Sequence, residues 1–485
     1  MPDGPRYAAI DLGATSGRVV TGRLRDGRVS LAEAHRFPNR PVRLPDGLHW
    51  NLLHLFTEAL LGLRHAGPVH GIGVDTWGVD YGLLDARGRL LGLPYHYRDE
   101  RTSGMAERAF QRVPQAELYA TTGIQTLPIN TAFQLLADEG SRSLQGADRL
   151  ALVPDLLSYW LCGELANERT NASTTGLLDA GSGDWATELI ERLGLPARLF
   201  GPLVEPGTAL GRLLGHHELG AATVHAVASH DTASAFAAAP VRDEHAAILS
   251  SGTWSLVGLE LPAPVLGHAA REANLTNERG VDGTTRLLKN VMGMWLLEEC
   301  RRAWGDVAYE DLHGLAQSVA GDVPLFDPDD ESFLAPGNMP ARIAAACERG
   351  GQPAPGATGE TVRSILLSLA CKYRWVIERL EVVSGRDVRR IHVIGGGARN
   401  ALLCRLTADI CGREVLAGPV EATALGNVLV QARAAGELGS LAELRTVAAA
   451  SVEPIVDEPA ADRDAAEATY KRFLDVTRLS APTTA

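Results

Sequence analysis

Two widely separated stretches of the chain share one outline, and this repetition constrains the fold more than any other feature. The first, AAIDLGATSGRVV (Ala8–Val20), has an apolar run, a turn rich in glycine and hydroxyl residues, and a second apolar run. The second, AAILSSGTWSLVGLEL (Ala246–Leu261), has the same order of features. Apolar runs joined by such turns predict β-hairpins. We therefore predict two similar halves, each opened by a hairpin, that face each other across a cleft.

The length of the chain agrees with two halves. At 485 residues it exceeds what one hydrophobic core usually serves, so two domains are expected. A charged stretch, VRDEH, comes directly before the second hairpin. We place the boundary there, which predicts an N-terminal domain of residues 1–241 and a C-terminal domain of residues 242–485.

Strands and helices alternate along both halves. Apolar residues recur at helical spacing from Leu52 to Ala66, and RIHVIGGGARNALLCRLTADICGREVLAG has the pattern of strand, glycine turn, helix and strand. We expect a further helix in LLKNVMGMWLLEE, with Asn290 and Glu298 on one face, and an acidic tail after the helix in EATALGNVLVQARAAGEL. The alternation predicts a mixed α/β fold.

Charge and composition limit the partners. The formal net charge of −13 at pH 7 argues against broad attraction to nucleic acid or anionic lipid. We find no signal peptide and no apolar run of about 18 residues, so we expect no membrane partner and a cytoplasmic location. The six cysteines form no CxxC pair, which predicts buried thiols. A monomer and a homodimer both stay open.

The turn of the first hairpin, DLGATSGR, has the composition of an anion site. Its glycines let backbone N–H groups converge, Thr15 and Ser16 can donate hydroxyl hydrogen bonds, and Arg18 adds positive charge. Asp11 at the strand end has the chemistry to hold Mg²⁺ through water. An ordinary tight hairpin with a surface arginine explains the same residues equally well.

Asp231 in SHDTASA stands between an expected strand end and an expected helix start. The common role for aspartate at such a place is an N-cap that accepts hydrogen bonds from free helix N–H groups. A general base that takes a proton from a substrate hydroxyl needs the same location, facing a cleft. From position alone, the N-cap is the favoured interpretation.

Two further motifs have alternative explanations. DTWGVD places Asp75, Trp77 and Asp80 around Gly78, which suits a sugar surface with polar groups and one ring, or a buried Trp beside a glycine turn. The triple glycine Gly395–Gly397 follows a strand, as in dinucleotide-binding folds, but its spacing departs from GxGxxG. Close approach to an adenine or ribose, or simple helix packing, explains these glycines as well.

Together these motifs resemble the FGGY family of carbohydrate kinases, within the superfamily of actin, hexokinase and Hsp70. The resemblance runs nearly end to end, through AIDLGATSGRV, GVDTWGVDYGLLD, ASHDTASA, LSSGTWSL, LKNVMGMWLL, HVIGGGARN and GPVEATALGN. It implies an α/β fold of two actin-like (ribonuclease H-like) domains with ATP and sugar in the cleft between them. DTWGVD and HDTASA direct it toward the members that act on L-rhamnulose.

The resemblance also assigns roles to individual residues. The implied ATP-binding residues are Ala14, Thr15, Ser16, Gly17, Arg18, Thr253 and Gly396. The implied sugar-binding residues are Gly78, His230, Asp231, Thr232 and Asn290. Asp231 becomes the catalytic proton acceptor, and Asp11 is the expected carboxylate beside the metal. Glu298 stands where the family pattern has a glutamine near ATP, so we leave it out of the site.

The implied reaction is phosphoryl transfer from ATP, with Mg²⁺, to the 1-hydroxyl of L-rhamnulose, a step in L-rhamnose catabolism. The expected partners are therefore the small-molecule sugar and ATP. Another ketose such as L-fuculose or xylulose is the first alternative. An NAD-dependent oxidoreductase, suggested only by the triple glycine, and a non-catalytic or chaperone-like ATP-binding relative are the others.

Overall fold

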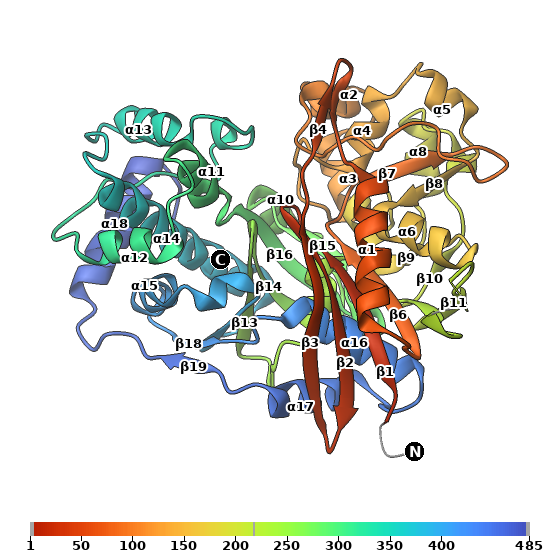
Figure 1. The fold of residues 1–485 in the computed structure, drawn as a ribbon. Coiled ribbons are helices and arrows are strands. Elements are labelled where there is room, and N and C mark those ends of the chain that lie inside the picture. The colour runs from red at the N-terminus through yellow and green to blue at the C-terminus, as the bar shows by residue number, and fades with distance from the viewer. Residues whose placement is uncertain (1–3, 217–218, 482–485) are drawn as a thin grey trace. The chain divides into compact units, whose positions relative to one another are not determined.

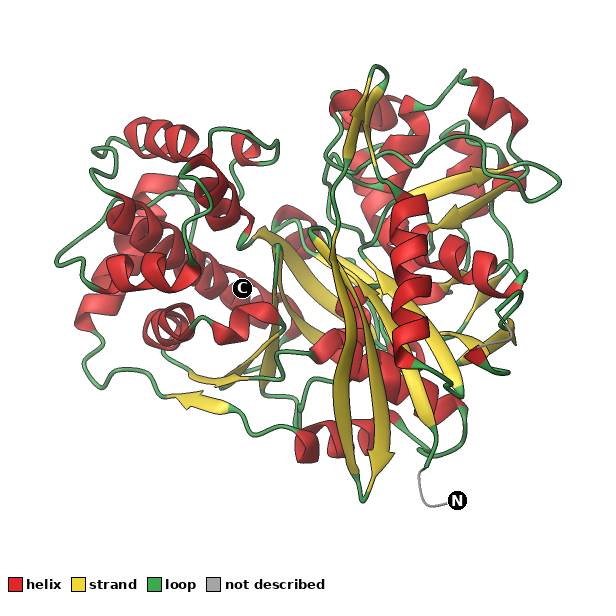
Figure 2. Cartoon of the chain, viewed as in Figure 1, coloured by secondary structure: helices red, strands yellow, loops and turns green. Residues whose placement is uncertain are grey.

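Residues 4–216 and 219–481 are described in the computed structural model. Their contacts divide the chain into two units, each assembled from three segments. Unit 1 consists of Met1–Pro240, Glu260–Leu287 and Ala422–Val452, and unit 2 of Val241–Leu259, Leu288–Glu421 and Glu453–Ala485. Figure 1 follows the chain by colour, and Figure 2 shows that both units combine helices and strands. The expectation of a mixed α/β chain is confirmed.

The first sheet belongs to unit 1 and has the strand order β11-β12-β6-β1-β2-β3. The opening hairpin β1–β2 is antiparallel, and β1, β6 and β12 run parallel to one another. The strands are β1 (Arg6–Leu12), β2 (Ser16–Arg25), β3 (Arg28–Pro38), β6 (Gly71–Thr76), β11 (Thr208–Arg212) and β12 (Thr223–Ala226).

The second sheet has the order β15-β16-β14-β13-β17-β18-β19. Its opening hairpin β13–β14 is antiparallel, β13, β17 and β18 run parallel, and β19 is antiparallel to β18. Apart from β15, this arrangement repeats that of the first sheet, as the two similar hairpins predicted. The strands are β13 (Ala246–Ser251), β14 (Trp254–Leu261), β15 (Thr276–Arg279), β16 (Thr285–Met292), β17 (Arg390–Ile394), β18 (Glu414–Ala417) and β19 (Ile455–Asp457).

Helices cover both faces of the first sheet, which explains why its central strands are apolar. Val19 of β2 lies against Gly62 of α1 (Leu52–Ala66), whereas Val20 packs in one core cluster with Val428 of α16 (Ala422–Ala434). Neighbouring residues of a strand point to opposite faces, so α1 and α16 lie on different sides. Figure 1 shows α1 alongside β1 to β3.

The position of α16 also explains why the units are not two continuous halves of the chain. This helix lies between β18 and β19 of the second sheet in sequence but contacts β1, β2 and β6 of the first. Segments 260–287 and 422–452 therefore belong to unit 1, although both lie beyond residue 241. The domain ranges 1–241 and 242–485 stay a prediction about domains, distinct from these compact units.

Unit 1 has further elements, several of which surround a second core that includes Phe133, Leu150 and Leu177. They are β4 (Val42–Leu44), β5 (Gly47–His49), β7 (Tyr81–Leu84), α2 (Met105–Arg112), α3 (Gln115–Thr122), α4 (Thr131–Ala137), α5 (Arg142–Gly146), β8 (Arg149–Leu152), α6 (Val153–Cys162), β9 (Asn167–Glu168), α7 (Arg169–Ala172), α8 (Thr187–Arg192), β10 (Leu203–Val204), α9 (Asp231–Ala237), α10 (His268–Glu272) and α17 (Leu441–Ser451).

The helices of unit 2 centre on the long α14, which packs against α12 and α15. The helices of this unit are α11 (Trp295–Ala303), α12 (Tyr309–Gln317), α13 (Met339–Arg349), α14 (Thr358–Ser384), α15 (Ala401–Cys411) and α18 (Asp464–Thr477).

One prediction of secondary structure was wrong, and the acidic tail contains elements that were not predicted. Residues 285–292 form the strand β16 and only 295–303 form a helix, so Asn290 and Glu298 do not share a helical face. The apolar run before Gly293 is a buried strand, which periodicity alone cannot distinguish from a buried helix. The acidic tail contains β19 and α18, because α18 buries Tyr470 and Phe473 on one side.

Two expectations about composition can be compared with the structure. All six cysteines are free and buried, as predicted. Within residues 4–216 and 219–481, no helix combines the length and the apolar character that crossing a membrane requires.

The contact between α9 and α16 leads to a first prediction. A Cβ at Gly426 would lie 1.8 Å from the backbone oxygen of Ser234, and backbone cannot move aside cheaply. We expect Gly426→Ala to lower the free energy of unfolding by about 1–3 kcal/mol. Gly314 of α12 has open space around it, so Gly314→Ala should instead raise stability by up to ~1 kcal/mol. Urea denaturation followed by circular dichroism measures both, and equal stabilities would contradict the packing argument.

Candidate active site

The turn between β1 and β2 is shorter than the sequence suggested. Leu12 already pairs with Gly17, so only residues 13–15 lie outside the strands. The Gly13 N–H donates to the Ser16 oxygen at 2.9 Å, and the Asn39 side chain donates to the Gly13 oxygen at 2.9 Å. The predicted phosphate residues Ala14 and Thr15 therefore form the turn, whereas Ser16, Gly17 and Arg18 begin β2.

Arg18 is engaged within the hairpin. Its Nε and Nη2 donate to Oδ2 of Asp11 at 2.8 and 2.7 Å. Both side chains are nearly buried, with 15% and 10% of their surface exposed. The Arg18 guanidinium thus orients the Asp11 carboxylate. The positive charge of Arg18 acts mainly on this carboxylate.

Carboxylates gather where the parallel strands of the first sheet end. Asp11 of β1 pairs in register with Asp75 of β6, and Thr76 forms a bridge with His230, directly before Asp231. Burial raises the pKa of Asp75 well above its usual value, and the charge of Asp11 adds to this effect. Carboxyl groups therefore lie close together at this edge of unit 1, and burial and the charge of Asp11 favour the protonated form of Asp75.

The chemistry of this edge suits a hydrated cation. Asp75 is fully buried, its Oδ2 accepts from Asn427 at 2.5 Å, and its Oδ1 has no hydrogen-bond partner among the residues that the structure describes. Mg²⁺ prefers carboxylate oxygen and keeps several waters, so one or two carboxylates are enough. Among the described residues no group of three or more His, Cys, Asp or Glu side chains forms a metal cage. Asp11 and Asp75 fit such a partial ligand set.

Asp231 is the first residue of α9, and His230 is the N-cap. The sequence-based interpretation of Asp231 as an N-cap was therefore wrong by one position. Its Oδ1 accepts hydrogen bonds from the N–H and the hydroxyl of Thr232, at 2.5 and 3.1 Å. The side chain keeps 31% of its exposure, so the carboxylate is reachable.

The surroundings of Asp231 make it a stronger base than an ordinary aspartate. Burial of the group by the surrounding protein raises its pKa, His230 lowers it, and Asp11 raises it again. The balance is a raised pKa. A general base gains from this change, because its proton affinity moves toward the operating pH.

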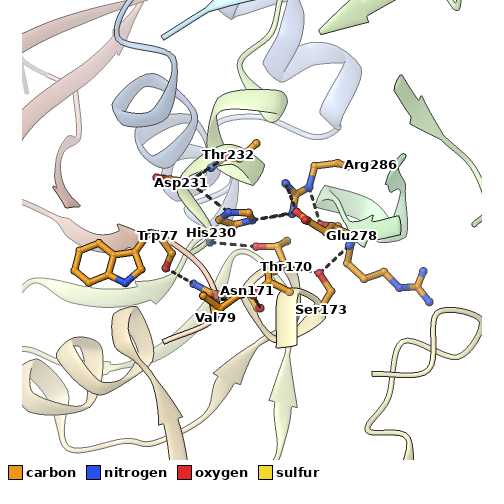
Figure 3. A network of polar contacts seen from close by, with 12 residues as sticks. Trp77, Val79, Thr170, Asn171, Ser173, His230, Asp231, Thr232, Glu278 and Arg286 are labelled. Carbon is orange, nitrogen blue, oxygen red and sulfur yellow. Dashed lines mark hydrogen bonds and ion pairs between the residues drawn. The ribbon is translucent and has the colours of Figure 1, made fainter. Parts of the chain in front are cut away.

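The loop before Asp231 is tied to α7 by a buried glutamate. Glu168 Oε2 accepts from the N–H and the hydroxyl of Ser229, each at 2.9 Å, and Oε1 accepts from the Thr170 N–H at 2.7 Å. The His230 N–H donates to the Thr170 hydroxyl at 3.4 Å (Figure 3). These bonds fix the backbone of the HDT motif, and sequence reasoning did not identify Glu168.

Gly78 lies in a strained but well-held turn. The next residue, Val79, has a φ of 67°, which is costly for a β-branched side chain. Its N–H donates to the Thr174 hydroxyl at 3.0 Å, and its oxygen accepts from Thr131 at 2.6 Å. A Cβ on Gly78 would lie 2.9 Å from Oγ1 of Thr174, so only glycine fits here.

The other side chains of DTWGVD are used inside the protein. Oδ2 of Asp80 accepts from the indoles of Trp50 and Trp77, at 2.5 and 3.0 Å, and Oδ1 accepts from Gln134 at 2.8 Å. The two indoles stack with centroids 3.8 Å apart. The structure thus supports the buried-Trp interpretation for Trp77 and Asp80.

The second hairpin contributes Thr253, which lies in the turn between β13 and β14. The Thr253 oxygen accepts from the Trp295 N–H at 3.1 Å, and the Gly252 oxygen accepts from Met294 at 3.0 Å. The start of α11 therefore holds this turn. Asn290 lies on β16, the strand that leads into α11.

The three glycines after β17 lie in different surroundings, so the structure explains each glycine differently. Gly395 has a φ of 81°, and a Cβ on Gly397 would lie 1.9 Å from the Ser251 hydroxyl. Gly396 is exposed and has open space around it. No internal contact requires glycine at this position, which is consistent with the approach of a ligand. The helix α15 begins only at Ala401, unlike the dinucleotide-binding pattern.

Glu298 is paired with cations of its own helix. Its carboxylate accepts from Arg301 at 3.0 and 3.1 Å and from the Tyr309 hydroxyl at 2.6 Å. Burial opposes ionisation of Glu298, but these bonds outweigh it and lower its pKa. The charge that departs from the family pattern is thus balanced locally.

Family models match almost all of the chain. The model described as the FGGY family of carbohydrate kinases, N-terminal domain, matches residues 7–237, and the C-terminal model matches residues 247–435. The chain belongs to the FGGY family of carbohydrate kinases. The expected resemblance is confirmed, and the oxidoreductase alternative suggested by the triple glycine is set aside.

Curated relatives of this FGGY kinase match at least nine-tenths of its length. The rhamnulokinase of Bacteroides thetaiotaomicron is 43% identical over 482 residues, which cover 97% of this chain and 99% of that protein. The rhamnulokinases of Enterococcus faecalis and Bacillus subtilis are 42% and 40% identical, and the matches cover 91% of this chain and 91% and 93% of those proteins.

Solved structures of a xylulose kinase and a glycerol kinase share the fold. A ligand-bound xylulose kinase from Lactobacillus acidophilus has a TM-score of 0.80 at 15% identity, with 97% of both chains covered. The glycerol kinase of Plasmodium falciparum with ADP has a TM-score of 0.75 at 14% identity, with 96% of both chains covered. The prediction of two actin-like α/β domains is confirmed.

Asp80 gives a prediction about pH. Burial raises its pKa to about 7, whereas an unfolded aspartate titrates near ~3.9. Between these values the folded chain binds the extra proton, so the stability that Asp80 contributes is lost as pH rises toward 7. The free energy of unfolding of the wild type, relative to Asp80→Asn, should therefore fall by roughly 3 kcal/mol between pH 5 and 8.

Urea denaturation at the two pH values measures this difference. Asp85→Asn is the control, because the hydrogen bond from Arg89 lowers the Asp85 pKa to about 2, so the group is ionised throughout this range. It should leave the pH dependence unchanged. A parallel pH dependence of wild type and Asp80→Asn would contradict the assignment.

Proposed function

We propose that this kinase transfers the γ-phosphoryl group of ATP to the 1-hydroxyl of L-rhamnulose, giving L-rhamnulose 1-phosphate and ADP. The proposal is supported by relatives named rhamnulokinase that are 40–43% identical over at least nine-tenths of the chain. The observation that carries the chemistry is the accessible carboxylate of Asp231, with its raised pKa, at an edge of the sheet lined by further carboxylates.

In the proposed step, the sugar oxygen bonds to phosphorus while the bond from phosphorus to the ADP oxygen breaks. Asp231 accepts the hydroxyl proton as this bond forms. Thr232 holds one carboxylate oxygen by two hydrogen bonds, which fixes the direction of the base. The reaction needs no other proton acceptor.

The two hairpin turns are the proposed phosphate contacts. Thr15 is exposed in the first turn, and Thr253 is partly exposed in the second. Hydroxyl and backbone N–H donors of Ala14 to Gly17 and of Thr253 stabilise negative charge on the transferring group. Gly396, with open space around it, is the proposed place where the nucleoside approaches.

ATP and Mg²⁺ are the proposed phosphoryl donor and cofactor. Asp11 would hold the ion, with Asp75 beside it, and Arg18 keeps the Asp11 carboxylate in place. When bound, Mg²⁺ supplies charge that offsets the phosphate oxygens. The proposed sugar contacts are Gly78, His230, Thr232 and Asn290. The cytoplasmic location and a monomer or homodimer stay predictions.

A substrate panel tests the function. A coupled assay measures the rate of ADP release. We expect this rate to rise sharply when L-rhamnulose is added and far less with L-fuculose, xylulose or glycerol. Phosphorus NMR of the product should show the ester at position 1. Equal rates across the panel would contradict the assignment, and a strong preference for another ketose would move it to that substrate.

Removing the base leads to the next prediction. Asp231→Asn should lower kcat by roughly 10²- to 10⁴-fold, because the proton acceptor is lost, and leave the KM for ATP nearly unchanged. In the wild type, kcat/KM should rise with pH through a pKa above that of an ordinary aspartate, since the base must be ionised. Asp243→Asn, on an exposed carboxylate, is the control. Near-normal turnover of Asp231→Asn would remove this residue from the base role.

Gly78 gives a prediction about binding. Gly78→Leu would push against Thr174 and fill the space of the proposed sugar contact. The KM for sugar should rise about 10-fold or more, with a smaller change for ATP. Gly267→Leu, where space is open, is the matched control. Unchanged sugar affinity would show that the pocket is misplaced.

A further inference from the structure

His230 stands between the proposed base and a buried ion pair. Its Nε2 is 3.5 Å from Oδ1 of Asp231, and only 9% of its side chain is exposed. Its Nδ1 is 3.2 Å from Nη2 of Arg286 and 3.3 Å from Oε2 of Glu278 (Figure 3). Each ring nitrogen therefore faces a different group.

Arg286 and Glu278 come from neighbouring strands and form the ion pair. Nη1 of Arg286 is 3.1 Å from Oε2 of Glu278, and the two side chains are 0% and 5% exposed. Nε of Arg286 donates to the backbone oxygen of Arg279 at 3.0 Å, which fixes the plane of the guanidinium. Figure 3 shows both side chains directed toward the His230 ring. The Arg286–Glu278 ion pair is thus held in a fixed orientation next to the Nδ1 side of the His230 ring.

The contact at Nδ1 distinguishes the two neutral forms of the imidazole. A guanidinium can only donate, so Nη2 of Arg286 bonds to Nδ1 only when that nitrogen carries no proton. The proton of the neutral ring is then on Nε2, which faces Asp231. Glu278 alone would favour the opposite arrangement, because its carboxylate can accept a hydrogen bond from a protonated Nδ1.

We propose that Arg286 and Glu278 are positioning residues for the phosphoryl-transfer site, and that Arg286 keeps the proton of His230 on Nε2, directed at Asp231. This inference rests on the proposed function, because it assigns the role of the base to Asp231. The Nε2–H then orients one carboxylate oxygen. Glu278 balances the charge of Arg286 and holds it in place.

The role of the pair follows from what each partner does alone. Without Arg286, the carboxylate of Glu278 would draw a proton onto Nδ1, and the ring would become an imidazolium between two carboxylates. Asp231 would then face a full positive charge and become a weaker base. Without Glu278, Arg286 still donates to Nδ1 and the tautomer is kept. The two partners are therefore unequal in catalysis, although both support the fold.

Several other charged residues lie around His230, Asp231 and Arg286. The test leaves these residues unchanged. Burial lowers the pKa of Arg286, and carboxylates on four elements oppose this. The pKa of Asp231 also responds to Asp11, and that of Asp75 to Asp231. The charged groups that influence the pKa of Asp231, Arg286 or Asp75 include Asp11, Arg18, Glu168, Glu260 and Glu278.

A double-mutant cycle tests the proposal. The proteins are the wild type, Arg286→Met, Glu278→Gln and the double variant, all as full chains. For each we would measure kcat, the KM values for sugar and ATP, the pH profile of kcat/KM, and the thermal unfolding midpoint. Breaking a buried pair destabilises either single variant, and removing both charges recovers stability. Stability and catalysis are thus reported separately.

The expected result is an asymmetry. Arg286→Met should lower kcat by about 10- to 100-fold and move the acid limb of kcat/KM to lower pH, with little change in the KM for ATP. Glu278→Gln should have the same acid limb of the kcat/KM profile as the wild type. The double variant should return the limb toward the wild type, because no carboxylate is left to hold an imidazolium. If Arg286→Met does not fold, Arg286→Lys keeps the charge but loses the Nη2 contact, and should shift the limb in the same direction.

Three results would overturn the proposal. They are identical acid limbs in all four proteins, a shift in Glu278→Gln as large as in Arg286→Met, and a shift of Arg286→Met to higher pH. The last would mean that Arg286 acts as a direct charge on Asp231. The cycle uses whichever ketose the wild type phosphorylates best. A failure of L-rhamnulose as substrate is therefore seen in the panel and is distinct from a failure of the cycle.

Discussion

The parallel strands β1 and β6 force Asp11 and Asp75 to lie side by side, and the candidate site depends on how that negative charge is balanced. Arg18 neutralises Asp11, the Asn427 amide supports Asp75, and a hydrated cation suits the remaining charge. Buried carboxylates without such partners would lose their proton only at high pH. Burial, with the charge of Asp11 adding to it, raises the pKa of Asp231, the proposed base.

A second constraint is that buried polar groups need partners, and this makes the site rigid. Glu168 takes hydrogen bonds from Ser229 and Thr170, and the Arg286 ion pair lies behind His230. The strained Val79 persists because Thr131 and Thr174 hold its backbone. Pre-organised groups of this kind cost nothing to align when the reaction occurs, which is what electrostatic stabilisation of phosphoryl transfer requires.

Much of the fold could be predicted because the chain repeats one local pattern. The hairpins at 8–20 and 246–261, the helix at 52–66 and the turn at Gly395–Gly397 all have strong local signals. The strand at 285–292 was mistaken for a helix, because a buried strand has no polar face to show its period. The membership of α16 in unit 1 was also not visible, since it depends on contacts between residues hundreds of positions apart.

The sequence by itself determined the two hairpins, the family and the motifs that carry the chemistry, because glycine turns, hydroxyl residues and apolar runs act over a few neighbouring residues. Only the tertiary structure decided which charges are paired: Arg18 with Asp11, Glu298 with Arg301, and Arg286 with Glu278 beside His230. The partners in each pair are close in sequence, but whether they are buried and face each other depends on the strands and helices that pack around them. A charged residue in a printed sequence therefore does not reveal whether it faces water, a ligand or another charge.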